Sequence, residues 1–161
     1  MRITKSEEYG LRLVLRLAAE GGQRTIRELA AMEGLPETTV AKVVSKLRRA
    51  HLVNAERGRN GGYSLTTAAR EITVGQVVGA FDSTVYGPDF CTRMTPGEER
   101  CANEGDCGLR PVWHGLTAVI GDFLSNITIA DIVGGTTGAR DGLPMVTGQQ
   151  HRPTDLVMER R

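Results

Sequence analysis

The feature that most constrains the fold of this 161-residue chain is the order of local signals in its first half. Three segments with apolar residues at helical spacing come first, and two short alternating segments around a glycine-rich basic turn follow. Recurrence every three or four residues predicts amphipathic helices, whereas alternation predicts strands. The sequence therefore predicts a mainly α fold with a small β-wing, in which a helix-turn-helix precedes a hairpin.

The first two helices are predicted from their apolar spacing and from their starts. The first covers residues 5–20, with Ser6 as its expected cap. Thr25 and Glu28 have the spacing of a capping box, which opens a second helix that runs through Met32.

A third helix is predicted from about Pro36 to Ala50, after a break at Gly34. Its apolar face is expected to be buried and consists of Val40, Val43, Val44 and Leu47. The other side carries hydroxyl and basic residues, namely Thr38, Thr39, Lys42, Ser45, Lys46, Arg48 and Arg49. The second helix of a helix-turn-helix enters the major groove. We therefore expect DNA contacts from four of these residues: Thr38 and Thr39 to bases or phosphates, Lys42 and Lys46 mainly to phosphates.

The hairpin that follows is predicted as a wing, with strands at 51–56 and 63–65. Its turn has the sequence Arg-Gly-Arg-Asn-Gly-Gly, in which glycines allow a close approach to a DNA backbone. Arg59 at the tip can enter a narrow minor groove, with Arg57 and Asn60 beside it. Taken alone, the same turn could be a solvated basic hairpin.

The second half continues with a helix capped by Thr73 and a longest helix from Pro111 to Ser125, followed by a short helix at 128–133. Residues from Gly134 onward lack periodicity and predict a disordered tail. The expected divisions are a winged helix-turn-helix domain (1–80), a cysteine-bearing loop (81–110), a dimerisation helix with the short terminal helix (111–133) and the tail (134–161).

Charge and motif content narrow the class of protein. Residues 1–75 carry a net charge of +5 and residues 76–161 a net charge of −4, so the first half suits a polyanion such as DNA, although solvated helix faces are the plainer alternative. No stretch has the length of a membrane span and no signal peptide is evident, which predicts a cytoplasmic protein. Phosphate-binding loops, nucleophile elbows and metal-protease motifs are missing, so we expect no enzyme and no small-molecule substrate.

Cys91, Cys101 and Cys107 are the chain's three cysteines and have the spacing C-x9-C-x5-C. In the cytosol, an odd number of clustered cysteines favours metal or redox chemistry over a structural disulfide. Thiolates are soft ligands that suit iron–sulfur clusters, zinc or copper(I). The spacing lacks the C-x2-C pairs of structural zinc sites and supplies three ligands where a cluster usually needs four. Structural zinc, a thiol switch and no metal at all remain alternatives.

These motifs together resemble the family of small winged-helix transcription regulators that includes IscR, NsrR and RirA. The resemblance rests on the cysteines and on four segments of the chain: residues 1–5, 9–12, 57–65 and 127–131. It covers about residues 1–133 and implies a homodimer that binds double-stranded operator DNA and, in many members, an iron–sulfur cluster in each subunit.

The resemblance also implies where a fourth ligand lies. IscR-like members have a histidine three residues after the last cysteine, where this chain has Arg110. NsrR-like members use a carboxylate at the eighth residue, donated by the other subunit, and this chain has Glu8 there. The implied set is Cys91, Cys101 and Cys107 with the partner's Glu8, which favours [4Fe–4S] over [2Fe–2S]. His114 is a weaker candidate, and Glu7 is interpreted as a helix-start charge.

The longest helix carries an apolar stripe that suits a helix–helix seam, made of Val112, Leu116, Val119, Phe123 and Ile127 and widened by Ile120 and Leu124. A two-fold dimer would match two DNA half-sites, whereas the plainer alternative is a core stripe within one subunit. The sequence thus predicts a transcription regulator, expected to be a repressor, that senses nitric oxide, iron or redox state through its cluster. The signal, the target genes and the form that binds DNA stay open, as does a winged-helix regulator that uses a thiol switch or structural zinc instead.

Overall fold

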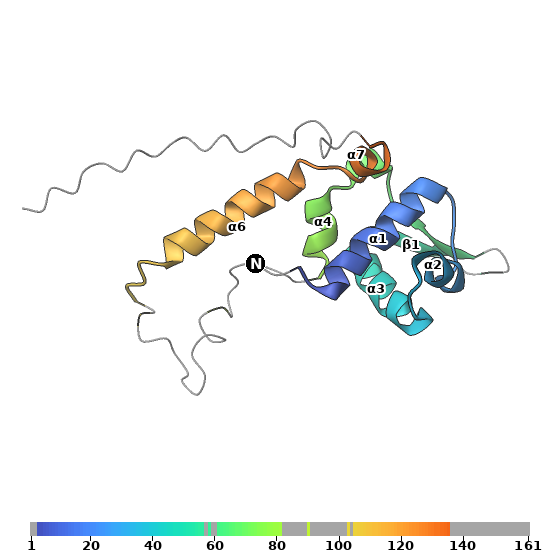
Figure 1. Ribbon diagram of the computed structural model, residues 1–161, viewed down its shortest axis with the longest axis horizontal. Coiled ribbons are helices and arrows are strands. Elements are labelled where there is room, and N and C mark those ends of the chain that lie inside the picture. The colour runs from blue at the N-terminus through green and yellow to red at the C-terminus, as the bar shows by residue number, and fades with distance from the viewer. Residues whose placement is uncertain are drawn as a thin grey trace, which may run out of the picture.

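The computed structural model of the chain describes residues 3–56, 58, 61–81, 90, 103 and 105–135. Its elements are α1 (Lys5–Glu20), α2 (Ile26–Glu33), α3 (Glu37–Arg49), β1 (Val53–Glu56), β2 (Gly62–Leu65), η1 (Ala69–Glu71), α4 (Val74–Gly79), α6 (Arg110–Ser125) and α7 (Ile129–Val133). Figure 1 shows one body of helices and strands from which α6 extends. This mainly helical architecture with one small antiparallel sheet confirms the predicted fold class. Among the described residues, no helix is both long and apolar enough to span a bilayer.

Capping boxes start α1, α2, α4 and α7. The box of α2, Thr25 with Glu28, confirms its prediction. The prediction of Ser6 as the cap of α1 is wrong, because Thr4 occupies that position. The Thr4 hydroxyl accepts a hydrogen bond from the Glu7 amide at 3.3 Å, and the Glu7 carboxylate accepts one from the Thr4 amide at 2.5 Å. Both orphan amides are satisfied by this reciprocal pair, which a cap at Ser6 could not provide.

The core lies between α1, α2 and α3, and α4, the wing and α7 close it. Leu13 and Val14 of α1 are fully buried, as are Leu29 of α2 and Ile129 of α7. The predicted inner face of α3 is confirmed, since Val40, Val43, Val44 and Leu47 are all buried. Burial of one apolar stripe per helix fixes which face of α3 remains available to a partner.

The wing is a two-stranded antiparallel hairpin in which Val53 pairs with Leu65 and Glu56 with Gly62. The first strand begins at Val53 and not at residue 51 as predicted, because His51 has a left-handed φ of 57° and belongs to the turn after α3. Arg24 and Tyr63 exchange backbone hydrogen bonds of 2.9 and 2.8 Å, which anchor the hairpin to the loop before α2. A Cβ atom at Gly62 would lie 2.9 Å from the Arg24 carbonyl, so this close approach requires glycine.

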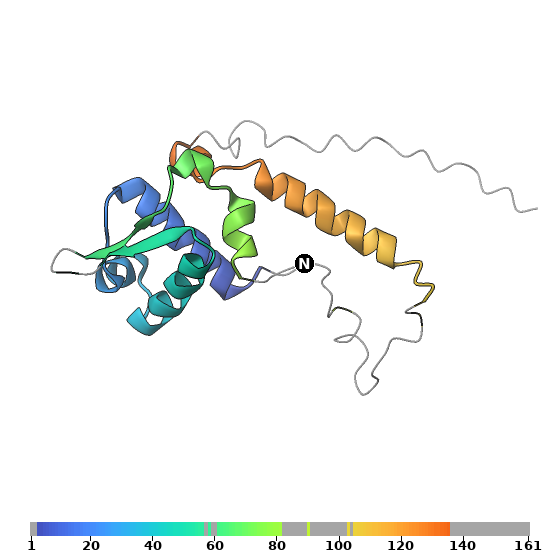
Figure 2. The ribbon, with the colours of Figure 1, turned by 180° about the vertical axis from the view of Figure 1, so that it is seen from behind.

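The segment that leads from α6 into α7 is tied to the body by backbone hydrogen bonds. Val74 donates to the Ile127 carbonyl at 2.9 Å, and the Ile129 amide donates to the Ile72 carbonyl at 2.8 Å. The other end of α6 points away from the body, as the reverse view also shows (Figure 2). No residue of α6 is buried. The short η1 turn was not predicted from the sequence.

Candidate nucleic-acid interface and metal centre

The outer face of α3 is the candidate surface for DNA. With 3.6 residues per turn, Thr38, Lys42, Ser45 and Arg49 lie opposite the buried stripe of this helix. Thr38, Lys42 and Arg49 are exposed and Ser45 is half-buried. Two small hydroxyl side chains and two long cations on one helix face can contact base edges and phosphates in a groove.

Thr39 and Lys46, which were expected to share that face, lie on its flank. Both are half-buried, whereas Lys42 is exposed. The Lys46 ammonium lies 5.5 Å from the centroid of the Phe81 ring, within the range of a cation–π contact. Lys42 is therefore exposed to solvent, whereas Lys46 is held against the ring of Phe81.

A shallow hollow of about 450 Å³ follows this surface and is lined by Ala41, Lys42, Ser45, Lys46 and Arg49. Its three cations give it a positive charge, which suits anions such as DNA phosphates. Arg49 was not among the residues expected to bind DNA, although its spacing of seven from Lys42 places both on one face.

The wing tip is described in part. The expected contacts Arg57, Arg59 and Asn60 lie outside the described residues. Gly58 is described and has a φ of +126°, a conformation that glycine alone adopts readily. Its carbonyl accepts a hydrogen bond of 3.0 Å from the Gly61 amide, which closes the turn between β1 and β2.

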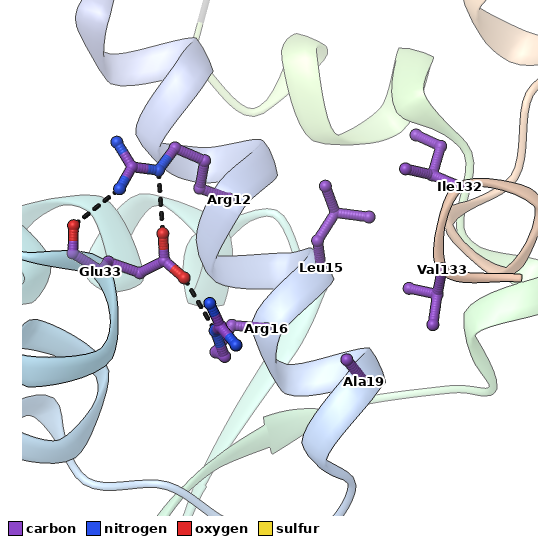
Figure 3. Close-up of a pocket in the computed structure, with 7 residues that line it drawn as sticks. All are labelled: Arg12, Leu15, Arg16, Ala19, Glu33, Ile132 and Val133. Carbon is purple, nitrogen blue, oxygen red and sulfur yellow. Dashed lines mark hydrogen bonds and ion pairs between the residues drawn. The ribbon is translucent and has the colours of Figure 1, made fainter. Parts of the chain in front are cut away.

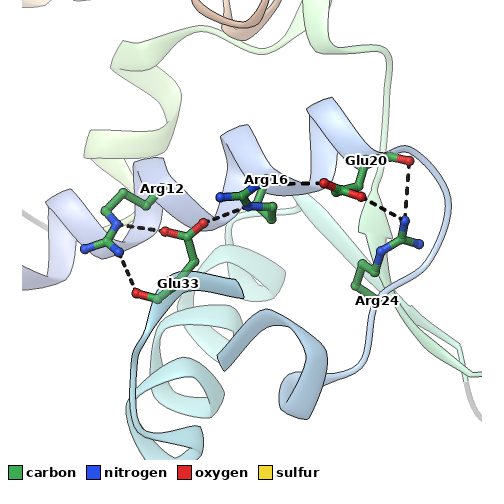
Figure 4. A network of polar contacts seen from close by, with 5 residues as sticks. All are labelled: Arg12, Arg16, Glu20, Arg24 and Glu33. Atoms are coloured by element: carbon green, nitrogen blue, oxygen red, sulfur yellow. Dashed lines mark hydrogen bonds and ion pairs between the residues drawn. The ribbon is translucent and has the colours of Figure 1, made fainter. Parts of the chain in front are cut away.

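An ion-pair network holds α2, the first helix of the pair, against α1 (Figure 4). The Glu33 carboxylate accepts 2.8 Å bonds from Nε of Arg12 and Nε of Arg16, and Arg12 also donates to the Glu33 carbonyl at 2.6 Å. Burial alone raises the pKa of Glu33, but the hydrogen bonds and charges of Arg16 and Arg12 outweigh burial and lower it below the ordinary value. The network ties the C-terminal end of α2 to α1.

A second hollow, of about 360 Å³, lies between this network and α7 (Figure 3). Arg12, Arg16 and Glu33 form one side of it, and Leu15 and Val133 are among the apolar residues of the other. Both oxygens of the Glu33 carboxylate accept hydrogen bonds from arginine side chains.

The candidate metal ligands are described only in part, because Cys91 and Cys101 lie outside the described residues. Cys107 carries a free, half-buried thiol. Its carbonyl accepts a 3.1 Å hydrogen bond from the Arg110 amide in the first turn of α6, whose positive end favours a negatively charged ligand atom. Within the described ranges, no three His, Cys, Asp or Glu side chains gather to hold a metal.

Two further observations bear on the expected ligand set. Phe90, the residue before Cys91, packs against Trp113 of α6 with ring centroids 6.2 Å apart, so the chain on either side of the cysteine segment meets α6 near its start. Glu8 is exposed, whereas Glu7 is 2% exposed and is occupied by the capping box. Figures 1 and 2 show the start of α6 far from α1, the helix that carries Glu8. His114 is exposed on α6.

Comparison with known proteins adds to this geometry. The Rrf2 family, described as "Iron-dependent Transcriptional regulator", matches residues 3–135. The chain is 31% identical over 157 residues to the HTH-type transcriptional repressor NsrR of Streptomyces coelicolor, covering 96% of this chain and 99% of that protein. It is 33% identical over 135 residues to the HTH-type transcriptional regulator IscR of Pectobacterium carotovorum, covering 83% and 79%.

Among solved structures, the fold is similar to that of CymR, the global cysteine regulator of B. subtilis. The TM-score is 0.63, with 24% identity over 84% of this chain and 98% of that one. This similarity supports the arrangement of elements alone.

Proposed function

We propose that this chain, which belongs to the Rrf2 family of iron-dependent transcriptional regulators, is a DNA-binding repressor whose affinity for its operator is set by an iron–sulfur cluster. The proposed divisions are the winged helix-turn-helix of residues 1–80, the cysteine region of 81–110 and the dimerisation elements of 111–133. The segment 134–161 lies almost wholly outside the described residues.

Binding of double-stranded DNA is supported by one observation above all. The exposed side of α3 carries Thr38, Lys42 and Arg49, and the hollow beside them is lined by three cations. The wing is anchored next to this helix pair through Arg24 and Tyr63. A helix in the major groove with a basic hairpin beside it combines base readout with phosphate neutralisation.

A homodimer is supported by the surface of α6. Val112, Leu116 and Val119 share one face and are 56%, 40% and 54% exposed. The described residues of one subunit leave these three side chains exposed, which supports the dimer over a core stripe within one subunit. An apolar stripe of this kind on an extended helix fits a second copy of the same helix, which would set the spacing of two α3 helices on two half-sites.

The cysteine region supplies ligands that suit an iron–sulfur cluster. In this proposal Cys91, Cys101 and Cys107 of one protomer and the exposed Glu8 of its partner hold it, with [4Fe–4S] favoured over [2Fe–2S]. Arg110 stands where IscR-like members have a histidine, which leaves Glu8 as the better fourth ligand. When bound, such a cluster supplies a labile centre that nitric oxide, oxygen or iron shortage can alter.

The coupling to DNA follows from the position of α1. Glu8 lies in the first turn of α1, and this helix packs against α3 through the buried core. Attachment of Glu8 to the partner's cysteine region would therefore bias how α1 and α3 are held. A shift in DNA affinity needs a free-energy difference between the two states, and ~1–3 kcal/mol is typical of such coupling.

A second candidate is a winged-helix regulator without a cluster, which responds through its thiols or holds structural zinc. It is favoured by the number of thiols, because the chain has three cysteines where a cluster usually has four.

The two candidates are distinguished by anaerobic purification, absorption spectra and analysis of iron, sulfide and zinc, followed by DNA binding with and without metal. Brown protein with stoichiometric iron and sulfide, and operator affinity that changes when the metal is removed, is the expected result. Colourless protein without iron under anaerobic conditions would contradict the cluster and favour the second candidate.

A further inference from the structure

Phe81 lies where three regions of the protein meet. It follows α4 and is the last residue of the continuously described stretch 61–81, ten residues before Cys91. Its side chain is buried, with 6% exposed, and belongs to the core. Its ring also contacts two helices: it packs against α1 and lies beside a lysine of α3.

The contact with α1 is made at Gly10. A Cβ atom added to Gly10 would overlap Cε2 and Cζ of the Phe81 ring. Glycine within a helix is less favourable than alanine, because it leaves the unfolded backbone more freedom. The close approach of the ring explains why glycine occupies this position of α1. Gly10 lies two residues after Glu8, the proposed ligand.

The contact with α3 is made by Lys46, whose Nζ lies 5.5 Å from the centroid of the ring. A lysine on a helix surface otherwise samples many rotamers, and fixing it on binding costs conformational entropy. The electron-rich face of an aromatic ring attracts the ammonium and narrows this range before DNA arrives. Lys42 on the neighbouring position of α3 is exposed, and the described residues give it no such ring.

We propose that Phe81 is a positioning residue for DNA binding: its ring, seated on Gly10, holds the Lys46 ammonium at the flank of α3 for a DNA phosphate. Phe81 thereby connects the beginning of the cysteine segment to the affinity for DNA. This inference rests on the proposed role of α3 as the DNA-binding helix and does not require that a cluster is bound.

The test uses the full-length, metal-free protein and a fluorescently labelled double-stranded DNA of mixed sequence. Phosphate contacts are independent of sequence and appear in the salt dependence of binding, so no operator is needed. Affinity is measured by fluorescence anisotropy over a salt series for Phe81→Leu, Lys46→Met and the double variant. A second, matched double-mutant cycle consists of Phe81→Leu, Lys42→Met and the variant that carries both changes.

We expect Phe81→Leu to weaken binding by about two- to fivefold, the range of an exposed cation–π contact. The slope of log affinity against log salt should become shallower by up to about 0.9, the value for one lost phosphate contact. In the Lys46→Met background, Phe81→Leu should have no further effect. In the Lys42 cycle, the two changes should be additive, because Lys42 is not held by the ring.

A purely structural role of Phe81 would weaken binding equally with lysine or methionine at position 46, and this result would overturn the inference. Stronger DNA binding by Phe81→Leu, or equal coupling to Lys42, would overturn it as well. Gly10→Ala provides a second variant, because it keeps the ring but displaces it. It should reproduce the loss seen in Phe81→Leu and lose its effect in the Lys46→Met background.

The same measurements separate this inference from the proposed function. If neither Lys42→Met nor Lys46→Met changes DNA binding, α3 is not the DNA-binding surface and both proposals fail. If each lysine matters but neither couples to Phe81, the inference about Phe81 alone is wrong.

Discussion

Glu7 and Glu8 are neighbours in α1, yet the Glu7 carboxylate is buried in the capping box and the Glu8 carboxylate is exposed. Glu7 accepts a hydrogen bond from the Thr4 amide, so its oxygens serve the start of the helix. Among the described residues, Glu8 has no such bond. This difference gives the two carboxylates separate roles that substitution can tell apart.

Replacing Glu8 by Ala is expected to lower the iron content of anaerobically purified protein and to remove the dependence of operator binding on the cluster. Thermal stability of the metal-free protein should stay unchanged, because the side chain is exposed. Glu7→Ala is the matched control, and it should destabilise the protein by about 1 kcal/mol through loss of the cap while the iron content stays normal. Normal cluster-dependent operator binding in the Glu8→Ala protein would show that Glu8 is not a ligand.

Glu33→Gln tests the network that fixes α2 on α1. The Glu33 side chain is 7% exposed and pairs with two arginines that are each 37% exposed, so water weakens the pairs. We expect a loss of about 1–2 kcal/mol in the free energy of unfolding at neutral pH, since hydrogen bonds to a charged group are replaced by weaker ones. Urea unfolding of both proteins measures this loss, and equal stability would contradict it.

The same pair of proteins should show a defined pH dependence. The arginines lower the pKa of Glu33 in the folded state below its ordinary value of 4.5, so the unfolded chain binds a proton first as the pH falls. The stabilisation is complete above pH 4.5 and is lost as the pH falls through the folded-state pKa. The stability difference between wild type and Glu33→Gln should be constant from neutral pH down to about pH 5.5 and should shrink below pH 4.5. A difference that grows on acidification would contradict this sign.

The elements of this fold that depend on local signals were predictable from the sequence, and those that depend on distant contacts were not. The capping box at Thr25 and the buried stripe of α3 follow from spacings of three and four residues, and both were predicted correctly. The hydrogen bonds from Arg12 and Arg16 to Glu33 span 21 and 17 residues, and no periodic pattern in the sequence predicts them. Thr4 and Glu7 have the same spacing as Thr25 and Glu28, so the capping box that starts α1 at Thr4 rather than at Ser6 is also a local signal.

The same contrast between local signals and distant contacts applies to the candidate DNA-binding and metal sites. The exposure of Thr38 and Lys42 follows from the helical wheel of α3 alone. The half-buried Lys46 lies beside the ring of Phe81, a residue that follows α4 and is distant in the sequence, so helical spacing alone does not predict this contact. The wing residues Arg57, Arg59 and Asn60 and the ligands Cys91 and Cys101 lie outside the described residues, so these assignments remain predictions.

Substitutions on α3 should change the salt dependence of DNA binding. Lys42→Gln and Arg49→Gln each remove one exposed cation of the hollow beside α3 and should each make the slope of log affinity against log salt shallower by about 0.9. Arg70→Gln is a suitable control, because Arg70 is 79% exposed on η1, which packs against α7. Its slope should equal that of the wild type. If Lys42→Gln and Arg49→Gln both had the slope of the wild type, the outer face of α3 would be excluded as the phosphate-binding surface.

Leu116→Glu tests the proposed dimer seam on α6. Leu116 lies between Val112 and Val119 on the apolar stripe, so a carboxylate there would be buried without a partner in a dimer. We expect about a tenfold or larger increase in the dimer dissociation constant, because full burial of a leucine side chain is worth about 1.5–3 kcal/mol and ~1.4 kcal/mol is a tenfold change. Ala118→Glu adds the same charge on the opposite, exposed side of α6 and should leave the dimer intact. Sedimentation velocity over a concentration series measures both. A Leu116→Glu protein that remains a dimer as tight as wild type would place the interface elsewhere, and it would remove the reason for drawing Glu8 from the partner subunit.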